Sequence, residues 1–180
     1  MKKLTLLLLV IAMMTFTAGT AFAEGKGIGI KGGWSMVLDD YDKAKYDDTW
    51  NAGGFFDMGK FLFDSLKFRP GLDYVKMKNK DNPNAEFKVW GIHLDWYWFF
   101  LSSGKIRPFL GFGPALNYYK FHDRQTNDND SDAGIEGFGG VEFDLTGSLA
   151  LMLEARYLWH DIADRDKALM KYNLGFIFKF

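Results

Sequence analysis

Few side chains of this chain have the types and spacing that covalent catalysis requires. Such a mechanism needs a nucleophile held beside a base, and the sequence offers three histidines but no cysteine. His93 is followed two residues later by Asp95, so in an extended segment both side chains lie on one face. We expect a structural hydrogen bond there and solvated loop positions for His122 and His160. The sequence therefore predicts no catalytic residue and no cofactor.

Alternate carboxylates between residues 123 and 132 resemble the start of a calcium-binding loop. They are Asp123, Asp128, Asp130 and Asp132. An EF-hand loop needs Gly at its sixth position and Glu at its twelfth. Counted from Asp128, those positions hold Ala133 and Gly139. We therefore expect a hydrated surface loop here and no metal site.

Glycines concentrate in residues 27–33, where they superficially match a dinucleotide-binding fingerprint. That motif must follow a strand and open a helix, whereas these glycines lie within one alternating segment. We expect them to permit close packing of backbone and side chains.

The elements that position these residues begin after a secretory signal. Lys2 and Lys3 precede an apolar run over residues 4–14 and an Ala-x-Ala site at residues 21–23. The run is shorter than the roughly 20 residues of a spanning helix. Removal of residues 1–23 from the 180 leaves 157, which suits a single domain over residues 24–180.

The charge of the mature chain argues against nucleic acid as a partner. The signal contains two of the 22 basic residues and none of the 23 acidic ones, which leaves a net charge of −3.

The rest of the chain alternates apolar and polar residues with a period of two, as β-strands of a barrel wall do. Eight segments show this period: 28–38, 50–58, 68–74, 90–98, 110–118, 135–145, 149–157 and 170–180. Pro114 lacks the N–H that a paired strand needs, so we expect a bulge there. The sequence predicts an all-β, eight-stranded, antiparallel up-and-down transmembrane barrel.

The connections between the segments alternate in length. Long polar stretches cover residues 39–48, 78–86, 121–133 and 160–167, and short turns lie near residues 64–65, 102–104 and 146–148. Long external loops and short periplasmic turns are typical of outer-membrane barrels. Because the sequence stops at the last segment, we expect no additional periplasmic domain.

Volume decides which face of the barrel is apolar. A soluble eight-stranded barrel alternates equally well with its apolar face inward, but its interior is only just wide enough for side chains. The apolar face carries all six tryptophans, which would overfill that space. They are Trp34, Trp50, Trp90, Trp96, Trp98 and Trp159. We therefore expect this face to contact lipid.

The opposite face is rich in glycine and carries charges of both signs. Buried charges persist only when they are paired, so the sequence predicts an ion-pair network that plugs the lumen. Its expected members are Lys31, Asp57, Arg69, Asp73, Asp95, Glu136, Glu142, Glu154, Arg156 and Lys171, with Asp144 on the same face.

Several aromatic residues also fall on the inward phase. They are Phe55, Phe61, Phe87, Tyr97, Phe99 and Phe138. Two interpretations remain open, since either the register shifts near the strand ends or the lumen is partly apolar.

The end of the chain resembles the C-terminal assembly signal of outer-membrane proteins. Asn173, Gly175, Phe178 and Phe180 occupy its polar, glycine and aromatic positions. The resemblance implies recognition by the barrel-assembly machinery.

The mature chain also resembles the OmpA/OmpX-like outer-membrane β-barrel domain family. The similarity is carried by residues 27–34 (GIGIKGGW), 68–74 (FRPGLDY) and 107–114 (RPFLGFGP). It implies the outer membrane of a Gram-negative cell. It also makes lipid A hydrolases and acyltransferases the enzymes to consider, but none of the three histidines has the His-x-Ser spacing of the deacylases.

The partners expected from this resemblance are outer-membrane lipid and lipopolysaccharide, and we expect a monomer. Several lysines lie near the expected outer rim, where acidic neighbours dilute their field and solvation is the simpler expectation. They are Lys43, Lys45, Lys76, Lys78 and Lys80. Weak bridging of divalent cations to lipopolysaccharide by the acidic loop stays open.

Scaffold does not determine function, so three hypotheses follow. The first is a non-enzymatic barrel for envelope integrity or surface interaction through its outer loops. The second is a narrow channel for ions or small solutes, and the third is a lipid A-modifying enzyme.

Overall fold

The computed structural model describes residues 26–38, 46–80, 82, 86–122, 127–160 and 167–180. The predicted signal segment, residues 1–23, lies outside these residues. No helix of the described part is long and apolar enough to cross a membrane.

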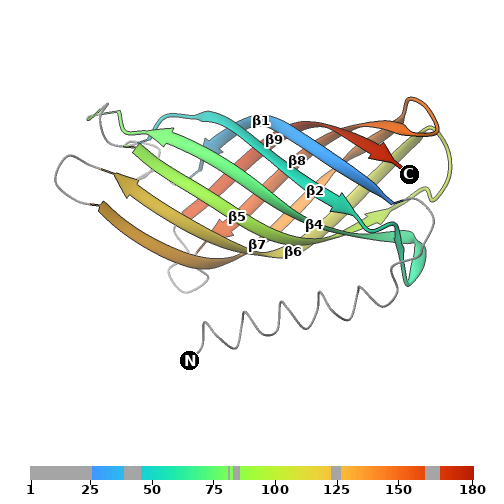
Figure 1. Ribbon diagram of the computed structural model, residues 1–180, viewed down its shortest axis with the longest axis horizontal. Helices are drawn as coiled ribbons and strands as arrows, with labels where there is room; N and C mark the ends of the chain where they lie inside the picture. Colours follow the sequence, from blue (N-terminus) through green and yellow to red (C-terminus); the bar gives the residue numbers. More distant parts are fainter. Residues whose placement is uncertain (1–25, 39–45, 81, 83–85, 123–126, 161–166) are drawn as a thin grey trace.

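Antiparallel strands form the wall of a barrel (Figure 1). The strands are β1 (Gly27–Val37), β2 (Thr49–Asp57), β3 (Lys60–Phe61), β4 (Phe63–Lys78), β5 (Glu86–Phe99), β6 (Ile106–His122), β7 (Asn127–Asp144), β8 (Leu149–His160) and β9 (Lys167–Lys179). The two-residue β3 pairs only with the start of β4. The eight long strands therefore make the barrel, which confirms the predicted fold class.

The barrel closes where the first strand meets the last. β1 pairs with β9 over eleven positions, from Gly27 opposite Lys179 to Val37 opposite Leu169. The Phe180 N–H extends this seam by donating to the carbonyl of Lys26 at 2.9 Å. Because the ring is closed, no long strand has an unpaired edge.

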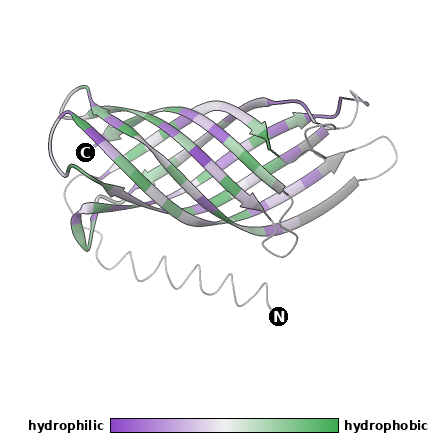
Figure 2. Ribbon diagram, turned by 180° about the vertical axis from the view of Figure 1, so that it is seen from behind, coloured by the Kyte–Doolittle hydropathy of each residue, from purple (hydrophilic) through white to green (hydrophobic). Residues whose placement is uncertain are grey.

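Hydrophobic and hydrophilic residues alternate along the strands as the sequence predicts (Figure 2). Most exposed large side chains are apolar, whereas the charged side chains on the opposite face are buried. Five of the six tryptophans are at least half exposed, up to 62 % for Trp98. So much exposed apolar surface is unfavourable in water and favourable against lipid. The face assignment is therefore confirmed.

Phe68 has the outward phase but is only 2 % exposed. Its ring is covered by Phe61 and Trp96, with ring centroids 6.0 and 5.3 Å away.

Two predicted boundaries are wrong. The turn expected at residues 64–65 lies at Leu62, which has a φ of 61° between the paired residues Phe61 and Phe63. The loop expected over residues 121–133 is mostly strand, because β6 reaches His122 and β7 starts at Asn127. The pairing of β6 with β7 continues without a shift beyond the apolar part of the wall, so polarity alone misplaced these ends.

The bulge expected at Pro114 is also absent. The register of β5 with β6 is the same on both sides of it, with His93 opposite Ala115 and Trp96 opposite Phe112. The proline removes a hydrogen-bond donor from the ladder without inserting a residue.

We call the end of the barrel where β1 ends at Val37 and β4 ends at Lys78 the outer end. The other end, with the short turns and the C-terminus, is the periplasmic end (Figure 1). This orientation follows from the lengths of the connections.

Candidate functional site

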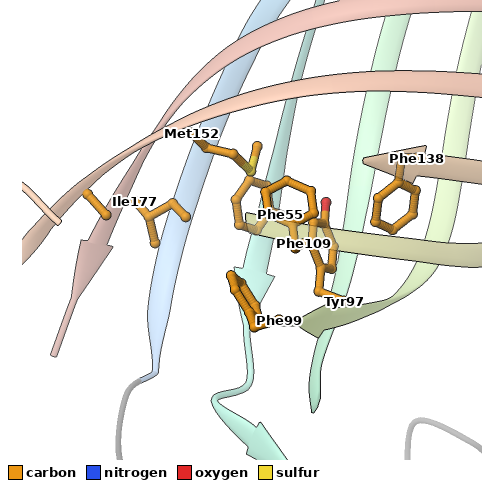
Figure 3. Packing of buried hydrophobic residues seen from close by; sticks show 8 residues of the cluster. Phe55, Tyr97, Phe99, Phe109, Phe138, Met152 and Ile177 are labelled. Atoms are coloured by element: carbon orange, nitrogen blue, oxygen red, sulfur yellow. The ribbon is translucent and has the colours of Figure 1, made fainter. Parts of the chain in front are cut away.

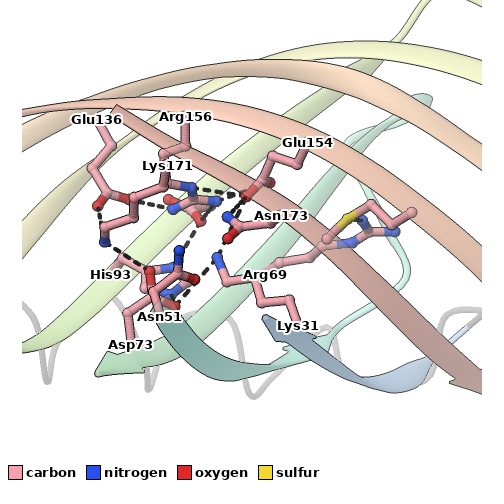
Figure 4. A network of polar contacts seen from close by, with 12 residues as sticks. Lys31, Asn51, Arg69, Asp73, His93, Glu136, Glu154, Arg156, Lys171 and Asn173 are labelled. Carbon is pink, nitrogen blue, oxygen red and sulfur yellow. Dashed lines mark hydrogen bonds and ion pairs between the residues drawn. The ribbon is translucent and has the colours of Figure 1, made fainter. Parts of the chain in front are cut away.

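The middle of the lumen contains four buried carboxylates that come from four strands. They are Asp73 (β4), Asp95 (β5), Glu136 (β7) and Glu154 (β8). Three permanent cations face them: Lys31 (β1), Arg156 (β8) and Lys171 (β9). Because inward positions recur every second residue, six of the eight long strands contribute one or two of these groups each. Figure 4 shows most of this central cluster.

Arg156 pairs with more carboxylates than any other cation of the central cluster. Its guanidinium lies 2.7 Å from Asp95 and 3.0 Å from Glu154, and it also pairs with Glu136. Its guanidinium carbon lies 4.3 Å from the centre of the Phe138 ring. This one side chain thus connects carboxylates on three strands, β5, β7 and β8.

The other side of the central cluster is built around Asp73. Its carboxylate lies 3.0 Å from Lys171, 3.4 Å from Lys31 and 3.4 Å from His93 Nε2. His93 Nδ1 in turn lies 2.7 Å from Asp95. The expected contact between His93 and Asp95 is therefore present, inside the lumen.

A second ionic cluster lies nearer the periplasmic end. Arg69 of β4 joins Asp57 of β2 to Glu142 of β7, with a nitrogen–oxygen distance of 2.7 Å to each. Lys67 lies 2.9 Å from Asp57. Glu142 is also paired with Arg107, and it lies 3.3 Å from Lys179.

The structure places all ten network residues named from the sequence in these two clusters. Sequence reasoning missed three cations of the periplasmic cluster: Lys67, Arg107 and Lys179. Together with Asp144, the sequence had named seven inward carboxylates but only four inward cations, and the three missed residues make the two numbers equal. Lys67 and Arg107 lie two residues before Arg69 and Phe109, so extending the same period past the chosen segment ends would have found them.

Aromatic residues lie between the two clusters, because Tyr97 donates to Glu154 of the central cluster at 2.7 Å and its ring faces Arg69 of the periplasmic cluster. The lumen is therefore partly apolar, and Figure 3 shows the residues of this layer. This layer consists of Phe55, Tyr97, Phe99, Phe109, Phe138, Ala150, Met152 and Ile177. The Arg69 guanidinium carbon lies 4.5 Å from the centre of the Tyr97 ring, which ties the layer to the periplasmic cluster. The structure supports the apolar lumen for Phe55, Tyr97, Phe99 and Phe138. At Phe61 the other interpretation holds, because the register shifts there. The side chain of Phe87 lies outside the described part.

Glycines opposite the rings make room for them. A Cβ at Gly29 would lie 2.1 Å from Phe55, and a Cβ at Gly111 would lie 2.1 Å from Phe138. Such contacts are far shorter than van der Waals distances. The close packing expected for the glycine-rich segment is present.

A second apolar layer lies toward the outer end. It consists of Val37, Val75, Met77, Val89, Ala115, Leu158 and Leu169. Tyr46 and Tyr119 pack against it. Described side chains thus fill the lumen in successive layers: apolar, ionic, aromatic and again ionic.

Residues 4–180 match the model of the family described as Outer membrane protein beta-barrel domain. The chain belongs to this family. This outer-membrane barrel protein therefore resides in the outer membrane with its apolar face against lipid, as the sequence resemblance implied.

Several solved structures share its fold. The Neisserial surface protein A is 15 % identical, with a TM-score of 0.70 over 86 % of this chain and 97 % of that chain. The N-terminal barrel of Pseudomonas aeruginosa OprF is 14 % identical, with a TM-score of 0.62 over 87 % and 100 %. Ail of Yersinia pestis, in complex with the heparin analogue sucrose octasulfate, is 14 % identical, with a TM-score of 0.58 over 87 % and 99 %. No curated protein matches the chain.

One group in the barrel lumen has donor atoms suited to a metal. Ligand atoms of His93, Asp95 and Glu136 lie within 4.8 Å of one another. Arg156 pairs with both carboxylates, so its guanidinium already provides the positive charge that an ion would bring.

The residues that resemble the assembly signal lie in β9 and at its end. Asn173 faces the lumen and donates to Glu154 at 3.0 Å, whereas Phe178 and Phe180 are exposed on the outer face. Phe180 is 72 % exposed and contacts Phe56 only loosely, with ring centroids 6.4 Å apart.

Proposed function

We propose that this barrel is a closed, non-enzymatic protein that supports envelope integrity or surface interaction through its extracellular loops. The layered filling of the lumen carries this proposal, because a conducting pore needs a continuous polar path and two apolar layers interrupt it. A closed barrel interacts with other molecules through its outer surface and its loops.

The narrow channel is the second hypothesis, and electrical recording tests it directly. Purified, folded protein in a planar bilayer should give no steady conductance above the empty bilayer. Well-resolved conductance steps that scale with the protein added would overturn the closed barrel.

The lipid A-modifying enzyme is the third hypothesis. A catalytic base must reach a lipid at the outer wall, but His93 is buried in the lumen between two carboxylates. The side chains of the other two histidines, His122 and His160, lie outside the described part. Incubation of the folded protein with lipid A should leave its acyl chains intact by mass spectrometry, and loss of a chain would refute the non-enzymatic proposal.

A role in the envelope predicts a loop-dependent phenotype. Cells lacking the protein should become more sensitive to bile salts or lose attachment to a host-cell layer. A barrel with its longest outer connection, residues 38–48, replaced by a short turn should fail to restore the lost property. Full restoration by this loopless barrel would argue for a role of the wall alone.

We further infer that residues 1–23 are a signal peptide, so the mature protein should begin at Glu24 by N-terminal sequencing. We also infer that the barrel-assembly machinery inserts the chain and that the barrel is a monomer beside lipopolysaccharide. The C-terminal residues described above support insertion by the barrel-assembly machinery.

A further inference from the structure

Three lysines lie side by side on the outer face of the wall. Lys76 of β4 pairs in register with Lys88 of β5, and Lys88 pairs with Lys120 of β6. Cβ atoms at such paired positions are about 5 Å apart, and like charges directly opposite each other destabilise a sheet. The arrangement therefore opposes folding unless something negative lies against it.

The lysine row sits directly above an aromatic row. Tyr74, Trp90 and Tyr118 pair in register in the same three strands, each two residues from the corresponding lysine. Tyr74 and Trp90 are in ring contact, with centroids 4.5 Å apart. Tyrosine and tryptophan on the outer wall mark the level where acyl chains end and headgroups begin. The lysines, one strand repeat of about 7 Å further out, are then at headgroup level.

One carboxylate partly offsets this charge. Glu86 lies 2.6 Å from Lys76 and 3.0 Å from Lys88. It begins β5 above the aromatic row, outside the membrane-spanning part of the wall. The hydrogen bonds from Lys76 and then Lys88 lower the pKa of the Glu86 carboxyl to about 2, so it is ionised near neutral pH.

The positive charge nevertheless exceeds the negative charge. Lys78 lies two residues beyond Lys76 on β4, in register with Glu86, and adds a fourth lysine beside the row. Among the described side chains, no carboxylate lies within ion-pairing distance of Lys78 or Lys120, and both lysines are exposed. Four cations and one anion leave a net charge of about +3 on this patch.

We propose that the patch formed by Lys76, Lys78, Lys88 and Lys120 binds the headgroup phosphates of an outer-leaflet glycolipid whose acyl chains lie against the aromatic row. A phosphate accepts several charge-assisted hydrogen bonds at once, and two phosphates would offset the excess charge. The proposal deepens the proposed function, because it rests on the same outer surface and names the chemistry of the lipid beside it.

The test uses folded protein in zwitterionic detergent micelles, with bound lipid measured by native mass spectrometry. The probes are bisphosphorylated lipid A, dephosphorylated lipid A and inorganic phosphate. Lipid A should bind at least about 25-fold more tightly than its dephosphorylated form, which offers no phosphate to any of the lysines. If inorganic phosphate competes as well as the lipid does, the lipid assignment is wrong.

The variant K88Q/K120Q should bind lipid A roughly 25-fold more weakly, since each of the two lysines near a membrane surface contributes about fivefold. The matched control K60Q/K105Q removes two lysines from exposed positions near the periplasmic end and should bind as the wild type does. Equal losses in both variants, or none in the first, would overturn the proposal.

Glu86→Gln should act in the opposite direction and strengthen lipid A binding several-fold, because it frees Lys76 and Lys88. A merely structural role for Glu86 would instead leave binding unchanged or weaken it. Heat-modifiable gel mobility checks that each variant is folded. A folded, non-conducting barrel without phosphate preference would reject this site and leave the proposed function standing.

Discussion

Arg69 and Glu142 are 73 residues apart in the chain, yet their side chains meet at 2.7 Å inside the lumen. Arg69 also holds Asp57 at the same distance, so one guanidinium links β2, β4 and β7 across the interior. Both carboxylates are fully buried. Ion pairs inside the lumen therefore stabilise the barrel in addition to the hydrogen bonds between its strands.

Replacing Arg69 with Met should destabilise the folded barrel strongly. The change leaves Asp57 and Glu142 buried with fewer partners, and breaking a buried pair from one side costs about 3–5 kcal/mol. The measurement is urea unfolding in lipid vesicles, followed by tryptophan fluorescence. Lys60→Gln, in an exposed pair, is the control and should change stability by less than about 1 kcal/mol.

Gly29→Ala should cost about 1–3 kcal/mol by overpacking the lumen, because its Cβ would lie 2.1 Å from the Phe55 ring. Combining Gly29→Ala with Phe55→Leu should relieve part of this cost, because leucine is smaller than the phenylalanine that the new Cβ would meet. Gly147→Ala is the control, since nothing lies within 4 Å of its Cβ position. Equal stability of the two single variants in urea would contradict the packing role.

Arg156→Ala should reduce stability without opening a path for ions. The change removes the side chain that pairs with Asp95, Glu136 and Glu154, which leaves a net negative charge in the central cluster. Planar-bilayer recording of the folded variant should show no conductance, because both apolar layers remain in place. Cation-selective openings that the wild type lacks would mean that the ion pairs of Arg156, and not the apolar layers, close the lumen.

Phe180→Ser separates assembly from stability. Because the Phe180 side chain is mostly exposed, the free energy of unfolding in detergent should change by only about 1 kcal/mol or less. The amount of protein in the outer membrane of cells should fall several-fold if the C-terminus is an assembly signal. Phe63→Ser, at another exposed aromatic of the periplasmic end, should leave that amount unchanged.

The sequence by itself determined the strands, the orientation of their faces and the residence of the protein in a membrane. Each of these depends on a period of two along one segment, because the pleat sends neighbouring side chains to opposite faces. Narrow lumen volume then forced the tryptophans outward. Lys31, Asp73 and Arg156 could thus be assigned to the interior without any coordinates.

Only the tertiary structure decided which groups meet. Pairing inside a closed barrel depends on the register of every strand with the next, and alternation along one strand contains no information about register. For this reason the contact of Arg69 with Glu142, the aromatic layer around Tyr97 and the row from Lys76 to Lys120 appeared only in the fold. The strand ends near His122 and Asn127 were misplaced for a related reason, since backbone pairing continues where the apolar pattern has already stopped.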